Sequence, residues 1–223
     1  MKAFVFLGPS LDRTSASTVI DAHFLPPIKR GDIDALFISS AQPTHIGIID
    51  GQFLHQPSIS PKEILVAMDR GVQFYGSSSI GALRAVELSP YGMIGVGQIY
   101  ELYQTGKVDA DDEVAITYDP DSLRNISEPL VNIRLALSEA IAAGVLSRHS
   151  SDEIITAGKS IYFPHRTYPV ILKKASVSLP QEEIEAFSTF LSERRPDAKK
   201  DDALELLKRI RTDMEGLDNE PDV

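Results

Sequence analysis

The chain has 223 residues, of which 43% are hydrophobic and 24% charged, as in an ordinary soluble globular protein. Its formal net charge of −10 argues against a nucleic-acid binder, because no face rich in Lys and Arg can form to contact phosphates. The lack of Cys excludes disulfides, thiolate catalysis and Cys-ligated zinc. No apolar run approaches the roughly 18 residues of a membrane span, so we expect a cytoplasmic protein that binds no membrane.

Short apolar runs alternate with helical patterns in the first half, which predicts an α/β fold with a largely parallel core sheet and flanking helices. The expected strands are Ala3–Leu7, His45–Ile49 and Val72–Tyr75. The expected helices are one reaching about Ile20, then Gly31–Phe37, Ile80–Leu88 and Ile94–Thr105.

A further helix has clear boundary signals. Ser60, Pro61 and Glu63 form the pattern of a capping box, with Ser at the N-cap, Pro at the first helical position and Glu at the third. Gly71 is a natural C-terminal stop. Lys62 therefore falls in the first turn of this helix.

The second half reads as mostly helical. An acidic turn, Asp109–Glu113, precedes Val114–Tyr118, which we interpret as an extra strand. The helices expected after it are Ser127–Ala143, Ser151–Ile161, Pro180–Ser192 and Lys199–Met214. We expect a core over residues 1–165 and a helical C-terminal region over residues 166–223 that packs on it. Ile184 and Phe187 would lie on one of its apolar faces, and Leu206 and Leu207 on another. Any apolar face left uncovered would serve a partner or a second copy of the chain.

The segment Gly76–Leu88 reads as strand end, tight turn and helix. Gly76 and Gly81 permit a sharp bend and a close approach of the backbone. Ser79 would then lie beside the first N–H groups of a helix, as an exposed nucleophile next to an oxyanion site or as part of a phosphate cradle. The alternative is that Ser79 only caps a packed helix.

In a parallel sheet, ligands bind outside the carboxyl ends of the strands. That rule places Ser10, Asp50 and Ser79 on one rim, with Lys62 nearby. A Ser–Lys pair would be catalytic there, with Ser79 as nucleophile, Lys62 as base, and the N–H groups of Ile80 and Gly81 stabilising an oxyanion. The alternative for Lys62 is a solvated surface side chain.

Other polar residues suggest further roles. Arg84 either pairs with Glu87 on the same helix or binds a carboxylate, including the C-terminus of a partner peptide. The five histidines show no metal spacing, and we interpret the acidic turn at Asp109–Glu113 as solvated. We therefore expect neither a metal nor a cofactor.

Several motifs, in order over residues 4–134, resemble the TfuA-like family. They are Phe4–Ser10, Pro26–Asp32, Ile46–Phe53, Lys62–Leu65, Gly76–Leu88, Tyr91–Gly97, Asp111–Ala115 and Ser127–Arg134. The chain departs from the family at Ile80, where Met is usual, a volume-conserving change.

The resemblance implies a partner of YcaO enzymes in peptide backbone thioamidation. It implies a hydrolase that acts on the thiocarboxylate at the C-terminus of a small ubiquitin-like sulfur carrier protein, releases sulfide for YcaO, and helps YcaO engage its target peptide. It also implies a Ser–Lys pair, which falls on Ser79 and Lys62, while Ser10 and Lys29 lie in matching segments and leave another pairing open. The alternatives are a non-catalytic adaptor that docks the carrier or peptide to YcaO, and a phosphate- or nucleotide-binding module.

Overall fold

The chain divides into two units in the computed structural model, which describes residues 2–39, 42–52 and 57–218. The first unit comprises residues 1–109 and 199–223, and the second comprises residues 110–198. The boundary expected at residue 165 falls inside the second unit, and the last helix belongs to the first. The two units are described separately below.

A parallel sheet forms the centre of the first unit, in the order β2-β1-β3-β4-β5. Its strands are β1 (Ala3–Phe6), β2 (His23–Leu25), β3 (His45–Ile48), β4 (Gln73–Gly76) and β5 (Ile94–Gly95). The predicted α/β fold with a parallel core sheet is confirmed. This strand order is that of a doubly wound sheet, in which helices cover both faces.

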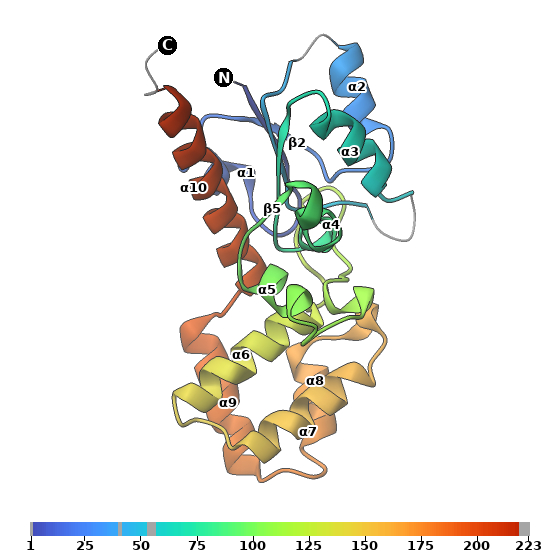
Figure 1. The fold of residues 1–223 in the computed structure, drawn as a ribbon. Coiled ribbons are helices and arrows are strands. Elements are labelled where there is room, and N and C mark those ends of the chain that lie inside the picture. Colours follow the sequence, from blue (N-terminus) through green and yellow to red (C-terminus); the bar gives the residue numbers. More distant parts are fainter. Residues whose placement is uncertain (1, 40–41, 53–56, 219–223) are drawn as a thin grey trace. The chain divides into compact units, whose positions relative to one another are not determined.

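Six helices surround this sheet within the described part of the first unit. They are α1 (Arg13–Ser17), α2 (Asp32–Ile38), α3 (Pro61–Met68), α4 (Ile80–Leu88), α5 (Gln98–Gln104) and α10 (Ala198–Asp218). Figure 1 shows α10 along one side of the unit and α2 and α3 on the other. Each face of the sheet therefore has its own helical cover.

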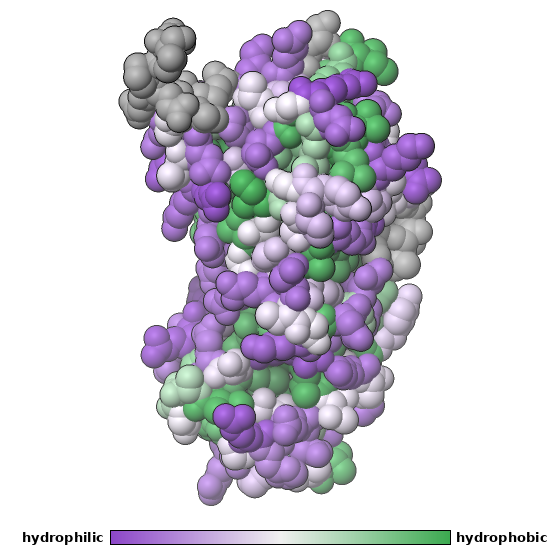
Figure 2. All heavy atoms as spheres, in the orientation of Figure 1, coloured by the Kyte–Doolittle hydropathy of each residue, from purple (hydrophilic) through white to green (hydrophobic). Residues whose placement is uncertain are grey.

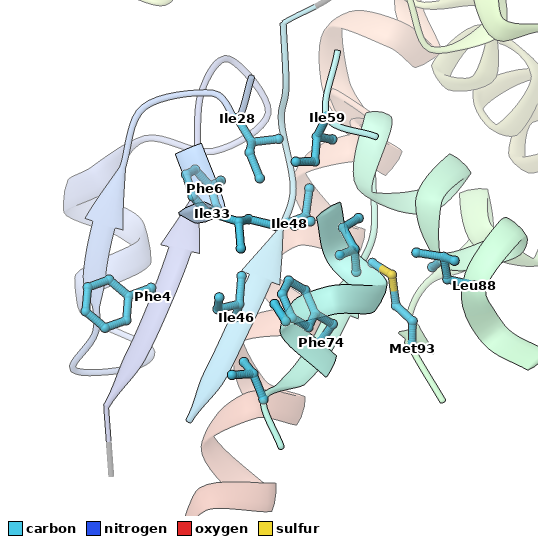
Figure 3. Close-up of a cluster of buried hydrophobic side chains, with 14 of the residues drawn as sticks. Phe4, Phe6, Ile28, Ile33, Ile46, Ile48, Ile59, Phe74, Leu88 and Met93 are labelled. Carbon is cyan, nitrogen blue, oxygen red and sulfur yellow. The ribbon is translucent and has the colours of Figure 1, made fainter. Parts of the chain in front are cut away.

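The core follows the alternation of side chains along the strands. Phe4, Phe6, Ile46, Ile48 and Phe74 point to one face and pack with residues of α2, α3 and α4, as Figure 3 shows for part of the cluster. The opposite face is covered by α10. Ala3, Val5 and Tyr75 from the strands pack there with Leu206, Leu207 and Ile210 from the helix. The expected packing of Leu206 and Leu207 on the sheet is thus confirmed.

Three expectations about local structure were wrong. Ile94–Thr105 is not one helix, because Gly97 adopts φ +96° and separates β5 from α5. Val114–Tyr118 forms no strand: Val114 ends a 3-10 turn with φ −95° and ψ −7°. The expected first helix reaching Ile20 is the shorter α1, which ends at Ser17.

The second unit is helical. It contains α6 (Leu130–Ala142), α7 (Arg148–Lys159), α8 (Tyr168–Ala175) and α9 (Gln181–Arg194). Ile184 and Phe187 of α9 pack with buried residues of α6, α7 and α8. Their expected position on the core sheet was therefore wrong.

The surface is mixed in character. On the face that Figure 2 shows, hydrophilic residues predominate and hydrophobic ones are scattered among them. No helix in the described ranges is sufficiently long and apolar to cross a membrane.

Candidate functional site

The carboxyl ends of the three central strands lie level with one another. Phe6 of β1 is in register with Ile48 of β3, and Ile48 is in register with Gly76 of β4. The loops that follow these strands therefore start from the same edge of the sheet. This is the edge at which doubly wound proteins bind their ligands.

The turn after β4 depends on close backbone contact. A Cβ atom at Gly81 would lie 2.6 Å from the carbonyl carbon of Ile48, and one at Gly76 would lie 2.8 Å from the carbonyl carbon of Gly81. Real Cβ atoms essentially never come within 3.0 Å of such neighbours. The predicted need for glycine at both positions is confirmed, and the start of α4 is pressed directly against the sheet.

Ser79 occupies the N-cap position of α4, but its side chain does not cap the helix. Its backbone has φ −125° and ψ −124°, and the preceding residue, Ser78, has a positive φ of +62°. Ser79 is half-buried, whereas Ser77 and Ser78 are fully buried. Ser79 is therefore the one partly exposed residue of the three, and its hydroxyl is not used for capping.

The amine of Lys199 lies next to the hydroxyl of this serine. Its Nζ lies 3.2 Å from Ser79 Oγ, although the two residues are 120 positions apart in the chain. Lys199 is the second residue of α10 and is only 2% exposed. Its backbone carbonyl accepts a hydrogen bond of 2.7 Å from Ser78 Oγ. The structure thus contains a Ser–Lys pair, formed by Ser79 with a lysine that sequence reasoning did not select.

Asp202 anchors the same turn of α10. Its carboxylate accepts the backbone N–H groups of Gln98 and Ile99 at 2.9 and 2.8 Å, at the start of α5. Gly97 is required here, because a Cβ atom would overlap this carboxylate. Burial raises the pKa of Asp202 to about 7. The first turn of α10 is therefore bonded to the turn before α4, through Ser78, and to the start of α5, through Asp202.

Lys62 lies in the first turn of α3, as predicted, and is exposed. Its Nζ has no hydrogen bond or ion pair within the described ranges, so the structure does not bring it to Ser79. The capping box is only half formed. Ser60 caps the N–H of Glu63, but the Glu63 carboxylate accepts the N–H of Gly31 instead of that of Ser60.

Ser10 is held by Asp50. The carboxylate of Asp50 accepts the backbone N–H groups of Gly8 and Ser10 at 3.0 Å each and the Ser10 hydroxyl at 2.7 Å. Ser10 and Asp50 are both buried. The turn after β1 thus already surrounds a carboxylate, and its amides are not free to bind a phosphate.

The remaining candidates have structural partners. Arg84 bonds both carboxylate oxygens of Glu87 at 2.6 and 2.7 Å and the carbonyl of Ile59 at 2.9 Å, so the predicted ion pair is confirmed. Lys29 lies 3.9 Å from Asp32. Ile80 is buried and would touch any Cβ atom placed at Gly51. Phe53, the last residue of one motif, and His55, one of the five histidines, lie outside the described residues.

The N–H groups at the start of α4 complete the arrangement. Those of Ile80 and Gly81 have no hydrogen-bond acceptor among the residues that the structure describes. N–H groups at a helix N-terminus attract negative charge. A hydroxyl, a buried amine and two available N–H donors are the parts that an acyl-transfer site needs.

A comparison with protein families gives a match over about half of the chain. Residues 50–167 match the family described as TfuA-like protein. The matched segment includes Ser79 but ends before Lys199. No curated protein matches the chain.

Proposed function

The chain belongs to the TfuA-like family, whose members are associated with YcaO enzymes in thioamidation, and we propose that it is a thiocarboxylate hydrolase with Ser79 as nucleophile. The substrate is the thiocarboxylated C-terminus of a small ubiquitin-like sulfur carrier protein. The product, sulfide, is then used by YcaO to thioamidate a peptide backbone. The observation that carries this proposal is the 3.2 Å approach of Lys199 Nζ to the hydroxyl of Ser79, a partly exposed residue.

Lys199 replaces Lys62 as the base in this proposal. A serine hydroxyl becomes a good nucleophile only when a base takes its proton, and a lysine can do so only as the neutral amine. Lys199 is 2% exposed, and its amine lies beside the Ser79 hydroxyl that it would deprotonate. Lys62 is exposed, so it has neither the contact with Ser79 nor the buried position that Lys199 has.

The proposed reaction has two steps, formation of an ester on Ser79 and hydrolysis of that ester. Ser79 Oγ attacks the thiocarboxylate carbon while Lys199 takes the hydroxyl proton, and the N–H groups of Ile80 and Gly81 bind the oxyanion. The C–S bond then breaks, and the Lys199 ammonium returns the proton to the leaving sulfur. Water, with Lys199 again as base, hydrolyses the Ser79 ester and frees the carboxylate of the carrier.

The test measures sulfide released from a thiocarboxylated ubiquitin-like carrier protein without YcaO or ATP. We expect Ser79→Ala and Lys199→Ala each to lower the rate by at least about 100-fold, and Lys62→Ala, the matched control, to leave it unchanged. Lys199→Arg keeps a positive charge but cannot act as a base, so it should be as inactive as Lys199→Ala.

Each contrary outcome has a definite meaning. Full activity of a folded Ser79→Ala protein would overturn the hydrolase proposal and favour an adaptor that only docks the carrier. Activity of Lys199→Arg would show that Lys199 acts only as a positive charge that binds substrate. Loss of activity in Lys62→Ala alone would restore the pairing predicted from sequence.

A further inference from the structure

Ser78 makes the contact that fixes the backbone of Lys199. Its Oγ donates to the carbonyl oxygen of Lys199 at 2.7 Å, and both residues are almost fully buried. Each hydroxyl has a single proton, so Ser77 must be the donor in its 3.2 Å contact with Ser78 Oγ. The bond to the lysine thus comes from Ser78 and not from Ser77.

The backbone at Ser78 supports a specific role. A positive φ is unfavourable for a residue with a side chain, and Ser78 has φ +62°. This conformation places two successive hydroxyls on one lysine: Ser78 bonds its backbone carbonyl, and Ser79 faces its amine. A lysine side chain is long and flexible, so fixing its backbone narrows the positions that its amine can reach.

We propose that Ser78 is a positioning residue, whose hydroxyl holds Lys199 so that its amine meets Ser79. This inference rests on the proposed function for its meaning, because Ser78 acts only through the Ser79–Lys199 pair. A displacement of about 1 Å in a catalytic group can lower a rate by about 100-fold. Ser78→Ala should therefore lower kcat by about 10- to 100-fold and leave KM unchanged.

The decisive experiment is a double-mutant cycle with Ser78→Ala and Lys199→Ala. The bond from Ser78 goes to the backbone carbonyl, which Lys199→Ala retains. Any purely structural effect of Ser78→Ala therefore persists in the Lys199→Ala protein, whereas a positioning effect disappears. Ser77→Ala is the matched control, since it removes a neighbouring hydroxyl of equal burial whose hydrogen bond goes to Ser78 Oγ and not to Lys199.

Two readouts are used: sulfide release from the thiocarboxylated carrier, and the rate at which a fluorophosphonate probe labels Ser79. In the otherwise natural chain, we expect Ser78→Ala to slow both sulfide release and labelling. In the Lys199→Ala chain, Ser78→Ala should change the labelling rate less than about 2-fold. Ser77→Ala should have little effect on either rate. An equal slowing of labelling in both backgrounds would overturn the positioning role, as would an equal effect of Ser77→Ala.

The failure of this inference is separable from failure of the proposed function. If neither Ser79→Ala nor Lys199→Ala lowers sulfide release, the hydrolase proposal fails, whereas the labelling rates still report on the positioning of Lys199. Ser78→Gly provides a second variant if Ser78→Ala folds poorly, because glycine adopts a positive φ readily and removes the same hydroxyl.

Discussion

Adding one methyl group at Gly81 tests how tightly α4 is held against the sheet. The Cβ of Gly81→Ala would lie 2.6 Å from the carbonyl carbon of Ile48 and 3.3 Å from the N of Ile49, and closer still to the Ile48 carbonyl oxygen. All three atoms are backbone atoms at the end of a central strand, so none can rotate away. Relief requires α4 to move outward, and overpacking of this kind lowers stability by 1–3 kcal/mol or more, so we expect a loss of about 3 kcal/mol.

The measurement is thermal unfolding followed by circular dichroism. A protein of this size loses about 2–4 °C in Tm per kcal/mol, so Gly81→Ala should melt about 6–12 °C lower. Gly216→Ala is the control: nothing lies within 4 Å of its added Cβ, and it should be neutral or stabilising by up to about 1 kcal/mol. A Tm for Gly81→Ala within about 2 °C of the natural chain would refute the close approach of α4.

Two further variants test the seating of α10. Leu206 is fully buried against the sheet, so Leu206→Ala should lower the free energy of unfolding by about 2–5 kcal/mol. The neighbouring residue Glu205 is exposed, so Glu205→Ala should change this free energy by less than about 0.5 kcal/mol. Urea denaturation measures both. Burial raises the pKa of Asp202 from 3.8 to about 7, so the folded protein binds this proton more firmly than the unfolded chain. The free energy of unfolding should fall as pH rises from 3.8 through about 7, and Asp202→Asn should flatten this dependence; an unchanged slope in Asp202→Asn would assign it to other groups.

The turn that carries Ser79 could be predicted because its signals are local. Gly76, Ser79 and Gly81 lie within six consecutive positions, and each is needed for a reason that the neighbouring chain already implies. Strand, turn and helix follow one another there without any long-range contact having to be known. The capping serine before Lys62 was predictable on the same grounds, and the structure confirms it.

Lys199 could not be predicted in this way. It lies 120 positions beyond Ser79, at the start of a helix whose sequence pattern indicates only an amphipathic face. The loops that follow the strands can be located from the sequence, whereas α10 reaches this edge of the sheet from a distant part of the chain. Lys62 was chosen because it begins a helix near the rim, but a helix start fixes where the backbone lies and not where a long side chain ends. β2 and β5 were missed because they have only three and two residues.

The discontinuous first unit gives the site an order of assembly during synthesis. Everything needed for the Ser79 turn is translated first, yet its lysine follows 120 residues later. At about 5–20 residues per second, the ribosome adds Lys199 about 6–24 s after Ser79. Throughout that interval the sheet lacks the helix that covers one of its faces, and the nascent chain carries a serine without its amine. The contact between Ser79 and Lys199 can therefore form only after residue 199 has been synthesised.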